Sequence, residues 1–255
     1  MKTVLMAAAL CAATTGLAQD ARKEIQRYRE MVAEGSPAEL FELEGEALWK
    51  KMDKCDLGLG PGVVKGAYAR LPRYFKDADR VMDLEARLLH CMTTLQGRSA
   101  KDATARVFGS ADRPSEFESL SAYIAAQSRG ARLEPGATHP KEKASIALGR
   151  ELFFHRVGPW DFSCASCHGT EGERIRMQDL PVLHQPQYAR PVMASWPAYR
   201  VSTSQFVTLQ WRMNDCFRQM RTPEPTFGSE TTVALIHFLT ATAKGAPYKG
   251  PGSKR

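Results

Sequence analysis

The sequence Cys164-Ala-Ser-Cys167-His168 limits this chain more than any other feature does. Two thiols at this spacing lie on one turn of a helix, where they reach the two vinyl groups of one porphyrin, and the histidine that follows meets the iron. A redox Cys-x-x-Cys pair or half of a zinc site is the alternative. The chain has no second Cys-x-x-Cys, no paired histidines and no alternation of strands with helices to support either. The motif therefore predicts one covalently bound haem c.

Residues 1–18 have the pattern of a secretory signal peptide: a lysine near the start, an apolar run, and a small residue at Ala18. The run is too short to stay as a membrane span, and no other apolar stretch is long enough for one. We expect this segment to be cleaved and the rest to reach the periplasm, where disulfides persist. The formal net charge of +7 is a moderate excess that favours small anions or an acidic partner. No nucleic-acid partner is expected, because basic and aromatic residues are not interleaved.

Six cysteines are present, and cleavage of the signal peptide removes Cys11. Five then remain, which is an odd number for an exported protein. The haem motif uses two of them. In an oxidising compartment the natural disulfide pair is Cys55 with Cys91. Cys216 is left without a partner and needs its own explanation.

Two segments of the chain resemble each other: LPRYFKDADRVMDLEARLLHC, which ends at Cys91, and WPAYRVSTSQFVTLQWRMNDC, which ends at Cys216. Further residues recur at the same distances before the two cysteines: Pro72 and Pro197, Tyr74 and Tyr199, Leu84 and Leu209, Arg87 and Arg212. Such a repeat indicates duplication of one domain. We therefore predict a mainly α fold with two tandem cytochrome c-like domains, residues 19–135 and 136–255. Apolar residues recur at helical spacing in segments 39–51, 80–95 and 231–243.

The first of these domains lacks a complete haem motif. Met52 stands where the first cysteine of the motif would be, and Asp56 stands where the histidine would be. Neither two thioether bonds nor an imidazole ligand is available there, so we expect no haem and a Cys55–Cys91 disulfide as a staple. The alternative is that Cys55 is an ordinary loop cysteine and the alignment is accidental. The disulfide is expected in either case.

Three interpretations compete for Cys216: a buried structural thiol, a bridge to another chain, or the distal ligand of the haem iron. Rival ligands on spacing alone are Met177, Met193, Met213 and Met220. Arg212 lies four residues before Cys216, on the same face of a helix. Guanidinium groups lower the pKa of a thiol and hold anions. This field favours Cys216 as an iron ligand over a merely structural thiol.

The chain resembles the SoxA family, the larger subunits of the SoxAX cytochromes of the periplasmic sulfur-oxidising system. Four stretches carry the resemblance: LGLGPGVVKGAYARLPRYF, GRELFFHRVGPWDFSCASCHG, WPAYR and LQWRMNDCFRQMR. It implies His168 and Cys216 as the axial ligands of the haem, with Cys216 often modified to a persulfide. It also implies Arg212 as the catalytic arginine beside that sulfur. Met52 and Asp56 make this chain similar to the members that keep a single haem.

This resemblance also implies an activity and partners. Members of the family act as L-cysteine S-thiosulfotransferase, which joins thiosulfate oxidatively to a cysteine of the carrier SoxYZ. The two electrons released pass by way of the haem to a SoxX-type small cytochrome c subunit, the partner in a heterodimer, and then to an acceptor cytochrome c. Two other functions stay open: a plain electron-transfer cytochrome c with His and Met ligands, and a thiosulfate dehydrogenase that forms tetrathionate.

Overall fold

The computed structural model describes residues 37–52, 54–175 and 178–254. Within these ranges there are nine α-helices and seven short strands, and the fold is mostly helical, as predicted. The expected signal peptide, residues 1–18, and the rival ligand Met177 lie outside the described residues. No helix in the described part of the chain is long and apolar enough to cross a membrane. We refer to residues 38–135 as the first half and to the described residues from 136 on as the second half.

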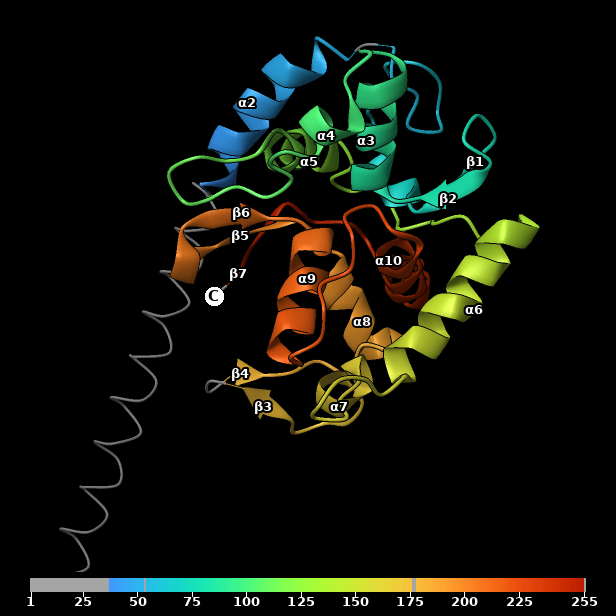
Figure 1. The fold of residues 1–255 in the computed structure, drawn as a ribbon, viewed down its shortest axis with the longest axis vertical. Coiled ribbons are helices and arrows are strands. Elements are labelled where there is room, and N and C mark those ends of the chain that lie inside the picture. The colour runs from blue at the N-terminus through green and yellow to red at the C-terminus, as the bar shows by residue number, and fades with distance from the viewer. Residues whose placement is uncertain (1–36, 53, 176–177, 255) are drawn as a thin grey trace, which may run out of the picture. The chain divides into compact units, whose positions relative to one another are not determined.

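The first half is built around two helices that cross, α2 (Ala38–Trp49) and α5 (Glu116–Ala126). They pack closely because Gly45 has no side chain: a Cβ at that position would lie 1.9 Å from the carbonyl oxygen of Ser119. Figure 1 shows α2, in blue, beside α5. The helix expected over residues 39–51 is confirmed, with its ends shifted by no more than two residues.

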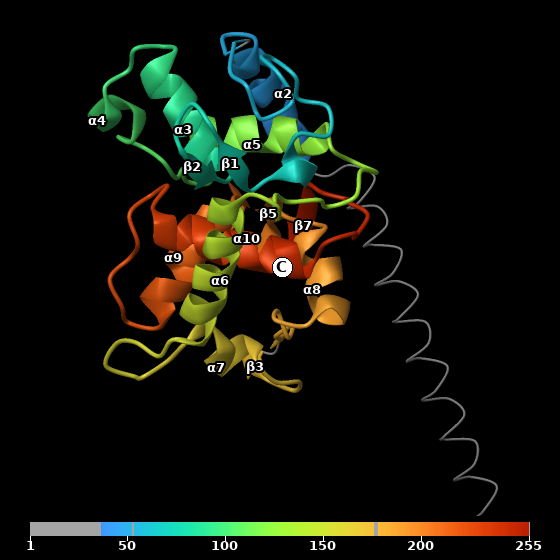
Figure 2. The same cartoon turned by 90° about the vertical axis from the view of Figure 1, so that its right-hand side faces the viewer.

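The second half repeats this pairing with α6 (Pro140–Phe154) and α10 (Glu230–Thr242). Gly149 is the contact point, since a Cβ there would lie 1.9 Å from the carbonyl oxygen of Ala234. Figures 1 and 2 show the two helices side by side. The helix expected over residues 231–243 is confirmed to within one residue at each end.

A β-hairpin leads into a helix in the first half. β1 (Arg73–Phe75) pairs antiparallel with β2 (Arg80–Met82), and α3 (Leu84–Thr94) follows. Asp83 separates the strand from the helix, because its side chain accepts a hydrogen bond of 2.8 Å from a backbone N–H of the first turn and so caps α3. The prediction of one helix over residues 80–95 is therefore wrong at its start, where the chain pairs with β1 instead.

The same order recurs in the second half. β5 (Ala198–Arg200) pairs antiparallel with β6 (Gln205–Val207), and α9 (Leu209–Gln219) follows. Thr208 caps α9 in the same way, by accepting a hydrogen bond of 3.2 Å from a backbone N–H of the first turn. β7 (Gly252–Lys254) pairs parallel with β5 and completes a sheet of order β6-β5-β7.

Buried hydrophobic side chains form one main cluster in each half, with a few members contributed by the other half. The chain from Ala38 on nevertheless forms one compact unit, so the division into two tandem domains at residue 135 stays a prediction. Short elements connect the larger ones: η1 (Tyr68–Arg70), α4 (Ala100–Ala103), α7 (Cys164–His168), β3 (Arg174–Ile175), β4 (Gln178–Asp179), α8 (Pro186–Met193) and η2 (Val201–Thr203).

Cys55 and Cys91 form a disulfide bond, with an S–S distance of 2.03 Å. Both residues are buried in the hydrophobic cluster of the first half. The bond joins the loop that follows α2 to the helix α3. The pairing predicted from the cysteine count is confirmed.

The first turns of α3 and α9 contact each other, and we call this the α3–α9 contact. Gln210 Nε2 donates to Asp83 Oδ1 at 3.0 Å and to Oδ2 at 2.8 Å, and the backbone N–H of Gln210 donates to Glu85 Oε2 at 3.3 Å. Both carboxyl groups are buried. Burial raises the pKa of Asp83, and burial followed by the charge of Asp83 raises the pKa of Glu85 well above its usual range. Among the described residues Glu85 Oε1 has no hydrogen-bond partner.

Candidate functional site

The Cys-x-x-Cys-His motif forms a short helix of its own, α7. Ser163 caps it: the Ser163 hydroxyl accepts a hydrogen bond of 3.2 Å from the backbone N–H of Ser166, and the Ser166 hydroxyl accepts one of 3.0 Å from the backbone N–H of Ser163. Cys164 and Cys167 therefore lie on one helical turn, as the spacing predicts. Both are free thiols and both are partly buried.

The side chain of His168 is held through one ring nitrogen. Its Nδ1 lies 2.8 Å from the carbonyl oxygen of Pro181, so Nδ1 carries the hydrogen and Nε2 carries the lone pair that a metal ion requires. Burial lowers the pKa of His168; the hydrogen bond to Pro181 opposes this change, and the charge of Arg212 adds to it. The imidazole is therefore neutral at pH 7, which is the form that binds iron.

Cys216 lies on α9 and is also a free, partly buried thiol. Burial raises its pKa and outweighs the charge of Arg212, which lowers it. The sequence predicts that the neighbouring arginines lower the pKa of Cys216. In the structure its pKa is raised instead, because other segments bury the sulfur. A bound metal ion deprotonates such a thiol directly.

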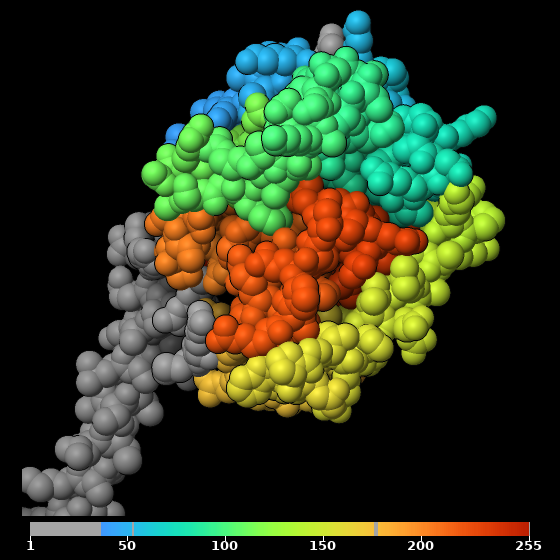
Figure 3. All heavy atoms as spheres, in the orientation of Figure 1, coloured from blue at the N-terminus to red at the C-terminus, as the bar shows by residue number. Residues whose placement is uncertain are grey.

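The three free cysteine thiols among the described residues of the second half lie near one another. Burial, and then the charge of Cys216, raise the pKa of Cys164 to about 12, and the charge of Cys167 raises the pKa of Cys216. Electrostatic effects of this kind require short separations. In Figure 3 the yellow segment that contains α7 lies against the orange segment that contains α9. The structure therefore brings together Cys164, Cys167, His168, Arg212 and Cys216.

This set of donor groups fits haem c. Two thiols on one helical turn suit two thioether bonds, an imidazole held by Nδ1 suits proximal ligation, and a thiol from a second helix suits the distal position. Ligation by Cys216 stays a prediction, since rival methionines are buried in the same half: Met193, Met213 and Met220.

Arg212 has a partner that the sequence analysis missed. Its Nη1 lies 2.6 Å from Oδ2 of Asp215, the residue before Cys216. Two further guanidinium groups approach the same carboxylate, that of Arg218 at 3.5 Å and that of Arg200 at 3.9 Å. We call Asp215 and these three arginines the arginine cluster. The i, i+3 spacing of Arg212 and Asp215 was an available signal, whereas Arg200 comes from β5 and gave none.

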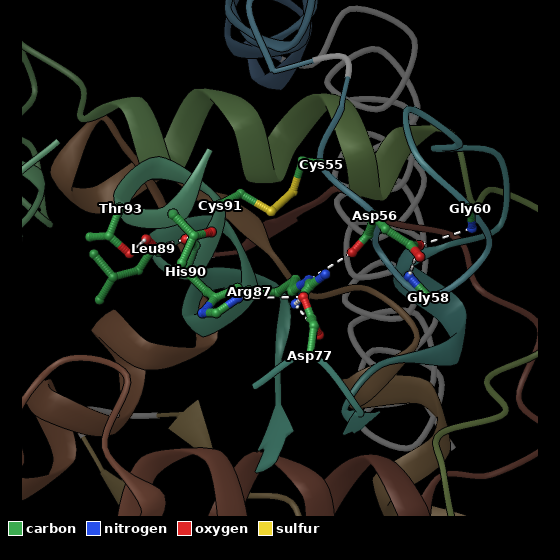
Figure 4. Close-up of polar contacts among 11 residues, drawn as sticks. Cys55, Asp56, Gly58, Gly60, Asp77, Arg87, Leu89, His90, Cys91 and Thr93 are labelled. Atoms are coloured by element: carbon green, nitrogen blue, oxygen red, sulfur yellow. Dashed lines mark hydrogen bonds and ion pairs between the residues drawn. A yellow bond between two sulfur atoms is a disulfide. The ribbon is translucent and has the colours of Figure 1, made fainter. Parts of the chain in front are cut away.

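The corresponding arginine of the first half, Arg87, has a structural role (Figure 4). Its Nε donates to the backbone carbonyl of Asp56 at 2.6 Å, and its Nη1 donates to both carboxylate oxygens of Asp77, at 2.9 and 2.7 Å. Only 5% of the side chain is exposed. Asp56 stands where a haem motif has its histidine, and Asp77 lies in the turn between β1 and β2. Arg87 therefore connects the incomplete motif to this hairpin, beside the Cys55–Cys91 bond.

Residues 38–133 match the family model described as the SoxA/TsdA cytochrome c domain. A cytochrome c domain implies haem c as the cofactor of the chain, and the complete Cys-x-x-Cys-His motif lies outside the matched residues, in the second half. Over its whole length the chain is 47% identical to the L-cysteine S-thiosulfotransferase subunit SoxA of Hydrogenophilus thermoluteolus, of which it covers 99%. A protein of the same name from Hydrogenobacter thermophilus is 37% identical, over 75% of this chain and 69% of the relative. The fold is similar to the crystal structure of SoxXA from P. pantotrophus, with a TM-score of 0.69 and 22% identity, over 90% of this chain and 84% of that one. The chain therefore belongs to the SoxA family, whose members are named L-cysteine S-thiosulfotransferase subunits.

Proposed function

We propose that this protein is the SoxA subunit of a periplasmic L-cysteine S-thiosulfotransferase, which joins thiosulfate oxidatively to a cysteine of a SoxYZ-type carrier. One observation supports this most: a free thiol, Cys216, lies with Arg212 on a helix that comes close to the Cys-x-x-Cys-His helix. A plain electron-transfer protein needs no cation beside its iron ligand. An enzyme that conjugates thiosulfate needs both a soft sulfur and a positive charge.

A single haem c belongs to this proposal. The residues that would hold it are Cys164 and Cys167, through thioether bonds, and His168 and Cys216, as ligands of the iron. When bound, the haem would accept the electrons of the reaction one at a time and pass them on. The first half offers no second site of this kind, because the thiol of Cys55 is used in the disulfide and Met52 and Asp56 take the other two positions.

The reaction forms one sulfur–sulfur bond, between the outer sulfur of thiosulfate and the sulfur of the carrier cysteine. Thiosulfate and the carrier thiol together yield the carrier S-thiosulfonate, one proton and two electrons, so an oxidant is required. The oxidant is an acceptor cytochrome c, and each reaction consumes two molecules of it because one haem takes up one electron. We propose that it is reached through a SoxX-type small cytochrome c subunit, which forms a heterodimer with this chain.

The side chains of the second half supply the sulfur and the charge. Cys216 presents a soft, polarisable sulfur, as a thiolate or a persulfide, next to which the outer sulfur of thiosulfate can be held. Arg212 is 25% exposed, so its guanidinium group can meet an anion from the solvent. It neutralises part of the double negative charge of thiosulfate, and this favours bond formation because two anionic sulfur atoms otherwise repel each other.

Processing and domain organisation are also part of the proposal. Residues 1–18 are removed as a signal peptide on export, and the rest consists of two cytochrome c-like domains, residues 19–135 and 136–255. The recurrence of a hairpin, a capped helix and a glycine contact in both halves supports this duplication. Sequencing of the mature N-terminus should begin at Gln19; a retained leader would contradict export by this route.

Reconstitution tests the function. The purified, haem-loaded chain with its small cytochrome subunit is mixed with carrier, thiosulfate and oxidised cytochrome c. We expect one haem per chain in a pyridine haemochrome assay, reduction of the acceptor, and a mass increase of one S-thiosulfonate group on the carrier cysteine. A carrier with serine in place of that cysteine is the control. Reduction of the acceptor without modification of the carrier would contradict the proposal.

A thiosulfate dehydrogenase is the second candidate. The matching family model supports it, because this model describes the cytochrome c domain of SoxA and of TsdA proteins together. Such an enzyme joins two thiosulfate ions to tetrathionate and needs no carrier. Tetrathionate formation at an equal rate with and without carrier would support it over conjugation. A plain electron carrier would show neither product, and its haem would have the electron paramagnetic resonance signal of His/Met rather than thiolate ligation.

A further inference from the structure

The carboxylate of Asp215 is engaged on both of its oxygen atoms. Oδ2 accepts hydrogen bonds from Arg212 Nη1 at 2.6 Å and from Gln219 Nε2 at 3.0 Å, and it lies 3.9 Å from Arg200 Nη1. Oδ1 lies 3.5 Å from Arg218 Nη2. Only 19% of the side chain is exposed. A carboxylate enclosed in this way has a fixed position, unlike a mobile surface charge.

Trp211 supports two of the three arginines through its ring. The Cζ atom of Arg200 lies 5.5 Å from the ring centre and that of Arg218 lies 5.9 Å from it, both within the range of a cation–π contact. Arg200 comes from β5, whereas Trp211, Asp215 and Arg218 all lie on α9. The backbone of α9 thus positions the ring of Trp211 and the carboxylate of Asp215. These two groups in turn position the guanidinium groups of Arg200, from β5, and Arg218, from α9.

Guanidinium groups that lie close together repel one another, and long side chains without a counter-charge gain entropy by moving into solvent. Asp215 is the counter-charge common to all three. A second carboxylate, that of Glu224, lies 3.6 Å from Arg218, and the charges of Arg212 and Arg200 both act on the thiol of Cys216. Several ordered guanidinium groups beside a soft sulfur suit a sulfur-containing dianion, because their planar donors can bind its oxygen atoms together.

We propose that Asp215 is a positioning residue, which holds the guanidinium groups of the arginine cluster beside Cys216 and so sets where thiosulfate binds relative to that sulfur. This inference rests on the proposed function. The carboxylate has two opposite effects. It orders the arginines, which raises the rate of turnover, and it lowers the positive charge of the cluster, which weakens equilibrium binding of the anion. An ion pair that only stabilises α9 would not separate rate from binding in this direction.

The two effects separate in Asp215→Asn, which keeps the size of the side chain and removes its charge. In the haem-loaded complex, kcat with thiosulfate and carrier should fall about 10- to 100-fold, since misplacement of a catalytic group by about 1 Å costs this much. Thiosulfate binding in the absence of carrier, measured by isothermal titration calorimetry, should become about 2- to 5-fold tighter, the scale of one partly exposed charge. Asp215→Glu keeps the charge, so binding should match the wild type while kcat recovers only in part.

The matched control is Asp77→Asn, which removes the carboxylate that pairs with Arg87 in the first half. It should leave kcat and thiosulfate binding unchanged. Weaker binding in Asp215→Asn, or an unchanged kcat, would overturn the inference while leaving the proposed function intact. If Asp215→Asn does not fold, Asp215→Glu decides, because a loss of both rate and affinity there would also overturn it. A wild-type complex that neither binds nor conjugates thiosulfate would remove the proposed function and this inference together.

Discussion

Removal of the Cys55–Cys91 disulfide should lower the free energy of unfolding by an amount that depends on the length of the loop that the bond closes. The bond links residues with a sequence separation of 36. Closing a loop of that length reduces the entropy of the unfolded chain, which corresponds to about 4 kcal/mol of folding free energy at 25 °C. In a protein of this size the Tm should fall by about 8–16 °C. Replacing both cysteines with alanine is the appropriate perturbation, because both sulfur atoms are buried and no unpaired thiol is left behind.

Urea unfolding followed by far-ultraviolet circular dichroism measures this change in the free energy of unfolding. The visible spectrum of the haem should stay the same, since the residues that would hold it lie in the second half. Wild-type protein unfolded in a reducing agent is the control and should approach the variant. A difference in the free energy of unfolding below about 1 kcal/mol would refute the reasoning. It would show that the unfolded chain has nearly the same conformational entropy with and without the disulfide.

Three further predictions concern the site and the α3–α9 contact. Cys216→Met should raise the midpoint potential in a spectroelectrochemical titration, because a thioether favours ferrous iron more than a thiolate does, and should abolish conjugation; turnover near the wild-type rate would show that the sulfur is only a ligand. Arg212→Ala should lower turnover about 10²–10³-fold with the visible spectrum unchanged, and Arg212→Lys should restore only part of it; a changed spectrum would indicate a role in ligation instead. Burial raises the pKa of Glu85 in the folded state above its usual value of 4.5. The free energy of unfolding of the wild type should therefore fall as the pH rises from that value toward the folded-state pKa. Glu85→Gln should reduce this fall, as measured by urea unfolding at pH 5 and pH 8. An equally steep loss in the variant would place the effect elsewhere.

Much of the fold could be predicted because its signals are local. The helical spacing of apolar residues gave α2 and α10, and the cysteine count gave the disulfide. The start of α3 was misplaced because the apolar spacing continues through β2, and only the antiparallel partner strand and the Asp83 cap separate the two elements.

The candidate site was predictable as a set of residues but not as an electrostatic environment. Arg212 and Cys216 share one helix, so their spacing placed them together. The pKa of Cys216 depends on enclosure by segments far away in sequence, and burial reversed the direction expected from the arginine alone. Asp215 could not be singled out from the sequence, because an acidic residue among arginines is common on a helix surface. Its importance follows from the approach of Arg200, which comes from β5, to the same carboxylate.

The α3–α9 contact connects the first half, which has no complete haem motif, to the site proposed in the second half. The helix that carries Arg212 and Cys216 starts at a turn whose Gln210 is hydrogen-bonded to Asp83 and Glu85. The first half therefore supports the first turn of the helix that carries the proposed catalytic residues. If the second half were excised, Gln210 would lose these acceptors and the orientation of α9 would lose an anchor. In the proposed enzyme both halves therefore act as one mechanical unit, although the proposed haem site lies in the second half.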